Sequence, residues 1–179
     1  MRTAAFAVLF SLVCPFLLYA QTPIALTPRT VLGGTVQVLV PVDFAPMRED
    51  LLRVKYPSER RPSLVYTNPS ASVNLALHHT NTPLHPHQLA EAHTAMDAMF
   101  KRLYPAATWF QSGLTTINGR SFFLLDLRTP ALDTEVRNLM TGTSLHGRLL
   151  LISFNVTKER EAHWLPTAQK ILTSIQIRE

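Results

Sequence analysis

The chain has 179 residues and a mass of 20.1 kDa, the size of a single domain. Apolar residues make up 46% and charged residues 16%, which excludes an intrinsically disordered chain, and the low glycine content (6) excludes a glycine-rich repeat. The formal net charge is +5, but the basic doublets Arg60-Arg61 and Lys101-Arg102 do not extend into longer runs. Nucleic-acid binding needs a clustered basic stripe, so we expect no nucleic-acid partner.

The first twenty residues are typical of a secretory signal peptide. Arg2 gives a positive start, residues 4–19 form an almost unbroken apolar run, and Ala20 ends a segment suited to cleavage. The run is short for a membrane-spanning helix, and no later segment is long and apolar enough to be one. We therefore expect an exported protein, periplasmic or secreted, with no integral membrane span once residues 1–20 are removed. An uncleaved N-terminal anchor is the alternative.

Cys14 is the only cysteine and lies inside this apolar run. A bacterial lipid anchor needs a small residue before its cysteine, and Val13 stands there, so we do not expect lipidation. Cleavage after Ala20 leaves a mature chain without a disulfide, a thiol nucleophile or a cysteine-ligated zinc ion.

The first half of the remaining chain predicts strands around a short helix. Residues 21–34 carry two prolines and a Gly-Gly pair, and we expect them to be an extended lead-in or linker before a single domain at 35–179. Strands are predicted at 35–42, 63–67 and 72–78, and a short helix within 44–54, with Pro46 in its first turn. The strand at 72–78 alternates in character, with three apolar residues on one face: Val73, Leu75 and Leu77.

A long amphipathic helix is predicted between Pro86 and Pro105. Its apolar stripe repeats at three- and four-residue steps through Leu89, Ala92, Met96, Met99 and Leu103. A four-strand meander should follow at 108–117, 121–128, 135–141 and 148–156. The Asn118-Gly119 pair is a strong hairpin signal, because both residues of such a turn take positive φ. Arg128 is expected in the exposed turn that follows the second strand.

The last predicted element is a closing helix. Its apolar face is formed by Trp164, Ala168, Ile171 and Ile175. Pro166 is expected to kink this helix or to start it. The order of elements predicts an α+β fold, in which a long amphipathic helix and a C-terminal helix pack on an antiparallel sheet.

The element order and hydrophobic pattern resemble the small α+β domain shared by the PsbP family, the DcrB-like periplasmic proteins and the Mog-type nuclear import factors. The resemblance covers residues 35–178. It rests on VPVDF, KYPSERRPSLVYTNPSASVNLALHH, TTINGRSFFLLDL and GRLLLISFNV, and on a closing helix that contains Trp164 and ends ILTSIQI. It implies a non-enzymatic binding or assembly protein, and the export signal favours the DcrB-like branch. No functional residue of these families maps onto this chain.

Histidines are the most unusual feature of the composition. Five of the seven lie within residues 78–93: His78, His79, His85, His87 and His93. Neutral imidazole is a good ligand for Zn, Cu and Ni, and His93 could approach the close pair His85 and His87. However, His78 and His79 point to opposite faces of a strand, and few carboxylates lie nearby. We expect no metal and no cofactor, with His85, His87 and His93 as weak candidate ligands.

No catalytic motif is present. The segment from Gly142 to His146 resembles G-x-S-x-G, but histidine occupies its last position, and Ser144 lies in a predicted hairpin turn. The chain has neither a P-loop nor a dinucleotide-binding fingerprint. We therefore predict an exported, non-enzymatic binding or assembly protein of the cell envelope, which contacts another envelope protein. The alternative is a periplasmic metal or small-ligand binder that uses the His78–His93 segment.

Overall fold

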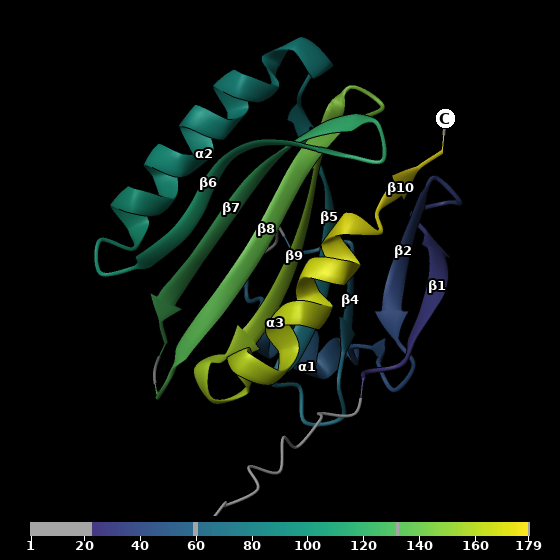
Figure 1. Ribbon diagram of the computed structural model, residues 1–179, viewed down its shortest axis with the longest axis vertical. Helices are drawn as coiled ribbons and strands as arrows, with labels where there is room; N and C mark the ends of the chain where they lie inside the picture. Colours follow the sequence, from purple (N-terminus) through teal and green to yellow (C-terminus); the bar gives the residue numbers. More distant parts are fainter. Residues whose placement is uncertain (1–22, 59–60, 132, 179) are drawn as a thin grey trace, which may run out of the picture.

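The computed structural model describes residues 23–58, 61–131 and 133–178, and the predicted signal peptide lies outside these ranges. Within them, the chain forms two antiparallel sheets and three α-helices, the predicted α+β architecture (Figure 1). None of the described helices combines the length and the apolar character needed to cross a membrane.

The larger sheet has the strand order β3-β4-β5-β9-β8-β7-β6. Its strands are β3 (Ala45–Pro46), β4 (Leu64–Thr67), β5 (Val73–Pro83), β6 (Thr108–Ile117), β7 (Arg120–Pro130), β8 (Glu135–Leu145) and β9 (Arg148–Thr157). Strands β6 to β9 form the predicted meander of consecutive hairpins. Strand β5 pairs with β9, which sets Val73 opposite Val156. This pairing leaves β6 as one outer strand and the two-residue β3 as the other.

A smaller sheet contains β1 (Leu26–Val31), β2 (Val36–Pro41) and β10 (Gln176–Ile177), in the order β1-β2-β10. Within the expected extended lead-in or linker, residues 26–31 form β1 and pair along their whole length with β2, so the fold includes residues before the predicted boundary at 35. Pro28 is tolerated because β1 is an outer strand, where one side of the backbone needs no partner.

Four helical segments complete the fold: α1 (Glu49–Lys55), the 3₁₀ turn η1 (Pro86–Gln88), α2 (Leu89–Leu103) and α3 (Lys158–Thr173). Pro46 was expected in the first turn of the short helix, but it lies in β3, before α1 begins. Pro166 lies inside α3, so it does not start that helix. Figure 1 shows α3 and the small sheet on one side of the large sheet, with α2 running beside β6 and β7.

Each face of the large sheet has its own core. The predicted apolar face of β5 is fully buried beneath α3 and β2. On the other face, Leu89, Ala92 and Met96 of α2 pack over β7, as predicted, but Phe100 joins them and Leu103 is 58% exposed. The stripe follows steps of three and four residues from Leu89 to Phe100, and Leu103 lies in the last turn, past the packed surface.

The hairpin turns have the predicted backbone. Asn118 and Gly119 have φ of 48° and 80° between β6 and β7, and His146 and Gly147 repeat this geometry with 49° and 71° between β8 and β9. The Asn118 side chain also donates hydrogen bonds to the carbonyls of Thr173 (3.2 Å) and Ile175 (2.8 Å). The first hairpin is thereby attached to the end of α3.

Candidate functional site

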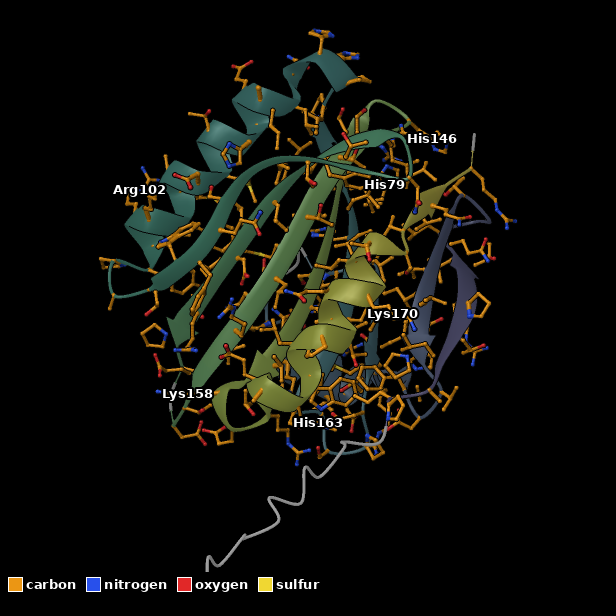
Figure 2. All side chains as sticks on the ribbon, in the orientation of Figure 1. His79, Arg102, His146, Lys158, His163 and Lys170 are labelled. Carbon is orange, nitrogen blue, oxygen red and sulfur yellow. The ribbon has the colours of Figure 1, made fainter. Side chains whose placement is uncertain are left out.

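The histidines of β5 lie near the β8–β9 turn, at one end of the large sheet. The Nε2 atom of His79 is 3.0 Å from the carbonyl oxygen of Leu145, and its ring centroid is 6.3 Å from that of His146 (Figure 2). Burial, together with the charge of His79, lowers the pKa of His78. Figure 2 shows His163 on α3, near the opposite end of the molecule.

The three weak candidate ligands take part in separate contacts. His85 and His87 flank Pro86 and stack on each other, with ring centroids 5.7 Å apart and planes 5° apart. The Nε2 atom of His93 lies 2.8 Å from the hydroxyl of Ser112 on β6. Across the described ranges, no group of three or more His, Cys, Asp or Glu side chains is arranged to hold a metal ion. Metal binding by His85, His87 and His93 stays a hypothesis, which titration tests.

The Ser112 hydroxyl joins α2 to β6. It donates to Asp97 Oδ1 at 2.7 Å, so His93 Nε2 must donate to the hydroxyl oxygen, because a hydroxyl has only one proton to give. Lys101 pairs with Asp97 at 2.6 Å, and the hydrogen bonds from Lys101 and Ser112 lower the pKa of the Asp97 carboxyl. A catalytic triad places the imidazole between carboxylate and hydroxyl. Here the hydroxyl lies in the middle, so the contacts position α2 rather than activate the serine.

Ser144 was expected in a hairpin turn, but it is buried in β8. Its hydroxyl donates to the carbonyl oxygen of Leu84 at 2.6 Å, and only 4% of the residue is exposed. This hydroxyl connects β8 to the segment before α2. It is therefore part of the core and is not placed to attack a substrate.

Four charged side chains form a network between α3 and the sheet. Arg137 binds both carboxylate oxygens of Asp126, at 2.5 and 2.8 Å, and donates to Glu161 at 2.9 Å. Arg128 makes a second bidentate pair with Glu161. Arg128 thus lies in β7 and is partly buried, contrary to the exposed turn expected from the sequence. Two cations meet two carboxylates, and Glu161 ties α3 to β7 and β8.

Phe110 covers this network from the outer strand. The register between β6 and β7 shifts between Trp109 and Gln111, which makes Phe110 a bulge residue. Its ring centroid lies 3.1 Å from the guanidinium carbon of Arg137, a cation–π contact. Phe110 is nevertheless 45% exposed. The network therefore holds a large aromatic ring in place at an accessible edge.

An accessible apolar region follows this edge, and we call it the edge surface. It consists of β6 together with four of the six exposed large hydrophobic residues in the described ranges: Leu103, Tyr104, Phe110 and Leu114. The ten residues of β6 include no charged side chain and no proline, and their strand partner in the described chain is β7 alone. Exposed edge strands usually carry charges or prolines that prevent pairing with another chain. Apart from its bulge and the contacts of Ser112 with α2, β6 has no such protection.

The sequence predicted the bounds of β6 but not its place in the sheet. Which strand lies outermost depends on the pairing of β5 with β9, between residues far apart in the chain. The signal that could have identified the edge surface was the uncharged stretch at 108–117 beside the basic pair Lys101-Arg102.

Neither a protein-family model nor a curated protein matches this chain. Several solved structures do. The cyanobacterial PsbP protein, CyanoP, from Synechocystis sp. PCC 6803 matches with a TM-score of 0.64 and 15% identity, over 89% of this chain and 96% of CyanoP. The chain has the PsbP/DcrB-like fold. The resemblance seen in residues 35–178 is thus confirmed at the level of fold.

Two further structures share this PsbP/DcrB-like fold. LpqN, which is involved in cell envelope biogenesis of Mycobacterium tuberculosis, matches with a TM-score of 0.57 and 12% identity, over 88% of this chain and 93% of LpqN. PA94 of Pseudomonas aeruginosa matches with a TM-score of 0.52 and 10% identity, over 86% of this chain and 98% of PA94. At these identities the likeness concerns architecture, and no residue role passes from one chain to another.

Proposed function

We propose that this chain is an exported, non-enzymatic binding protein of the cell envelope that contacts another envelope protein through the edge surface. The observation that carries this proposal is β6, an uncharged ten-residue outer strand flanked by exposed apolar side chains. The predicted signal peptide supports export. The shared fold of LpqN, a protein of envelope biogenesis, supports the compartment. The absence of an activated nucleophile at Ser112 and Ser144 supports a binding role.

The edge surface suits the addition of a strand. An extended segment placed beside β6 would satisfy its outward backbone groups, while side chains above and below the sheet supply selectivity. Leu114 lies opposite Phe123, which packs beneath α2, so Leu114 is on the α2 face. Phe110 contacts Arg137 on the α3 face. An added strand would therefore meet one apolar anchor on each face.

Charge favours a different protein over a second copy of this chain. The net charge of the full sequence is +5, or +4 without Arg2 of the predicted signal peptide. The exposed Arg102 lies in the last turn of α2, beside Lys101, which pairs with Asp97. Figure 2 shows Arg102 on the outer side of α2. Like charges disfavour association between two copies and favour an acidic partner. The proposed occupant is therefore an extended, apolar segment with acidic flanking residues in another envelope protein.

Site-specific photo-cross-linking in cells tests the location. A photoreactive phenylalanine analogue replaces Leu114 in β6, and the matched control replaces Val54 in α1, which is 76% exposed near the opposite edge of the sheet. We expect one discrete adduct from position 114, absent from position 54. Leu114→Lys should weaken binding of the identified partner by about tenfold or more, because it places a charge in an apolar contact. Equal adducts from both positions would refute the proposal.

Hydrogen exchange then tests strand addition. Backbone amides between residues 111 and 117 should become protected when the cross-linked partner is added to the purified protein. Protection elsewhere, with these amides unchanged, would show that docking does not use the β6 edge. An adduct with twice the mass of the chain would identify a second copy and contradict the proposed occupant.

A further inference from the structure

A row of uncharged polar side chains crosses four strands of the large sheet. Asn74 of β5 lies opposite Thr67 of β4 on one side and opposite Asn155 of β9 on the other. Asn155 in turn lies opposite Asn138 of β8. Residues directly opposite each other in antiparallel strands point to the same face of the sheet. We call these four residues the amide row, since three of them carry a side-chain amide.

The amide row lies on the face of the sheet that carries α1 and α2. Side chains two residues apart on a strand share a face, and Ala76 packs beneath α1 while Met140 packs beneath α2. This is the face away from α3, the far side of the sheet in Figure 1. Asn138 and Asn155 are partly exposed there. Ser153 of β9, two residues from Asn155, is also partly exposed and adds a hydroxyl to this face.

Hydrogen bonds join the amide row into two groups with a gap between β5 and β9. The Thr67 hydroxyl donates to Asn74 Oδ1 at 2.7 Å. Asn155 Nδ2 donates to Asn138 Oδ1 at 2.7 Å, and the Ser153 hydroxyl donates to Asn155 Oδ1 at 3.3 Å. No hydrogen bond joins Asn74 to Asn155, although the Cβ atoms of such an opposite pair lie only about 4.5 to 5.5 Å apart.

The amide nitrogen of Asn74 is an unused donor at this gap. Asn74 is only 8% exposed, and within the described ranges its Nδ2 atom has no hydrogen-bond partner. Every fully buried side-chain nitrogen or oxygen in those ranges does have a partner, so Asn74 Nδ2 must be in contact with the surface. A donor held in a mostly buried side chain favours a ligand that offers it an acceptor.

A secondary amide fits both sides of the gap. Its carbonyl oxygen would accept from Asn74 Nδ2, and its N–H would donate to Asn155 Oδ1, because an amide oxygen has two lone pairs and Ser153 uses one of them. The amide row itself contains no charged side chain. Lys55 of α1, a cation on this face, already donates to the carbonyl oxygen of Ala71 in the turn before β5. The groups around the gap are therefore hydroxyls and amides, which suit the hydroxyls of a neutral sugar.

We infer that the amide row binds an oligosaccharide through an N-acetylated amino sugar. The acetamido group of the sugar would bridge Asn74 and Asn155, and its hydroxyls would meet Ser153 and Asn138. A peptide also contains secondary amides, but it lacks the hydroxyls that match the rest of the site. The inference concerns a site separate from strand addition at β6, and it does not depend on the proposed protein partner.

Amide chemical-shift titration of the purified protein tests the site. Triacetylchitotriose and cellotriose share their linkage and length and differ in the acetamido groups, and N-acetyltriglycine methylamide has amides without hydroxyls. We expect saturable shifts at Asn74, Ser153 and Asn155 with triacetylchitotriose, and at least tenfold weaker binding of the other two probes. An absence of saturable shifts with triacetylchitotriose, or equal binding of either other probe, would overturn the inference.

Variants separate the two sides of the gap. Asn155→Thr should weaken triacetylchitotriose binding at least tenfold, whereas Asn81→Thr, at an exposed asparagine near the other end of β5, should leave it unchanged. Since Asn155 also bonds Asn138, a second variant guards against an effect on folding. Asn74→Asp keeps the acceptor for Thr67 and removes only the free donor, and it should also weaken binding at least tenfold. Unchanged binding in either Asn155→Thr or Asn74→Asp would overturn the inference.

Discussion

Arg137 and Asp126 form a bidentate ion pair across β7 and β8, with side chains only 6% and 11% exposed. Loss of one partner from a buried pair leaves an uncompensated charge, which typically costs about 3 to 5 kcal/mol. Asp126→Ala should therefore lower the free energy of unfolding by about 3 kcal/mol, at the low end because Glu161 still pairs with Arg137. Urea denaturation followed by tryptophan fluorescence measures this loss.

The exposed pair of Arg48 and Asp50 is the matched control for that experiment, since its side chains are 82% and 64% exposed. Asp50→Ala should leave the urea midpoint unchanged, because solvent screens exposed ion pairs. A loss in Asp126→Ala no larger than in Asp50→Ala would show that the buried pair of Asp126 and Arg137 contributes no more to stability than an exposed pair.

Asn118 stabilises two structures at once, the β6–β7 turn and the end of α3. Asn118→Gly keeps the positive φ but removes two hydrogen bonds to backbone carbonyls. Each such bond contributes roughly 1 kcal/mol, so we expect a loss of about 1 to 2 kcal/mol in thermal or urea unfolding. His146→Gly, at the same position of the other turn, should be neutral or slightly stabilising. Equal effects of the two substitutions would mean that the turn alone matters.

Gly142 in β8 is required by the aromatic ring beside it. A Cβ atom at this position would lie 2.2 Å from the Cζ atom of Phe123, whose side chain is fully buried. Gly142→Ala should displace the ring and destabilise the protein by about 1 to 3 kcal/mol. Gly113→Ala, in β6 with open space around its Cβ, should cost little. Adding Phe123→Leu to Gly142→Ala should recover part of the loss, and no recovery would locate the strain elsewhere.

His78 should make stability depend on pH. Burial and the nearby His79 lower its pKa below the ordinary value of 6.5. At pH values between the lowered pKa and 6.5, the unfolded chain therefore binds more protons at His78 than the folded chain does. The contribution of neutral His78 to the free energy of unfolding is complete above pH 6.5 and is lost as the pH falls toward the lowered pKa. Urea midpoints measured from pH 8 to 5.5 should fall less steeply in His78→Gln than in the unsubstituted protein. A steeper fall would contradict this assignment.

Zinc should bind weakly, because the contact of His93 with Ser112 keeps its Nε2 atom from serving as a third ligand beside His85 and His87. The stacked pair of His85 and His87 offers two ligands, whereas structural zinc sites normally use four. We expect native mass spectra with added Zn²⁺, Cu²⁺ or Ni²⁺ to show no stoichiometric metal after a chelator wash. Retained metal that disappears in a variant with both His85→Ala and His87→Ala would support the metal-binding alternative.

Local signals account for the parts of the fold that the sequence predicted well. The Asn118-Gly119 turn and the alternating strands around it are encoded within a few residues, so the meander from Thr108 to Thr157 was predicted almost to its ends. The β1 strand was missed because Pro23 before it, Pro28 within it and the glycines after it indicate a linker when read alone. Only its pairing with β2 shows why they are tolerated.

The candidate sites depend on contacts between distant residues, which a single sequence does not display. In the sequence alone, nothing distinguishes three members of the buried network from ordinary surface charges: Asp126, Arg137 and Glu161. The position of β6 at the edge follows from the pairing of β9 with β5, which the sequence alone does not show either. The His93, Asp97 and Lys101 series was visible at four-residue spacing on one helix face. Its partner, Ser112, was not.

The central pairing of β5 with β9 also sets the order in which the chain can fold. Val73 gains its neighbour Val156 only when most of the protein has been synthesised, and β2 gains β10 only at Gln176. Pairings between such distant segments close large loops and form slowly. A chain built in this way has no finished small sheet until Gln176 and Ile177 have been synthesised, which would suit the export that we propose.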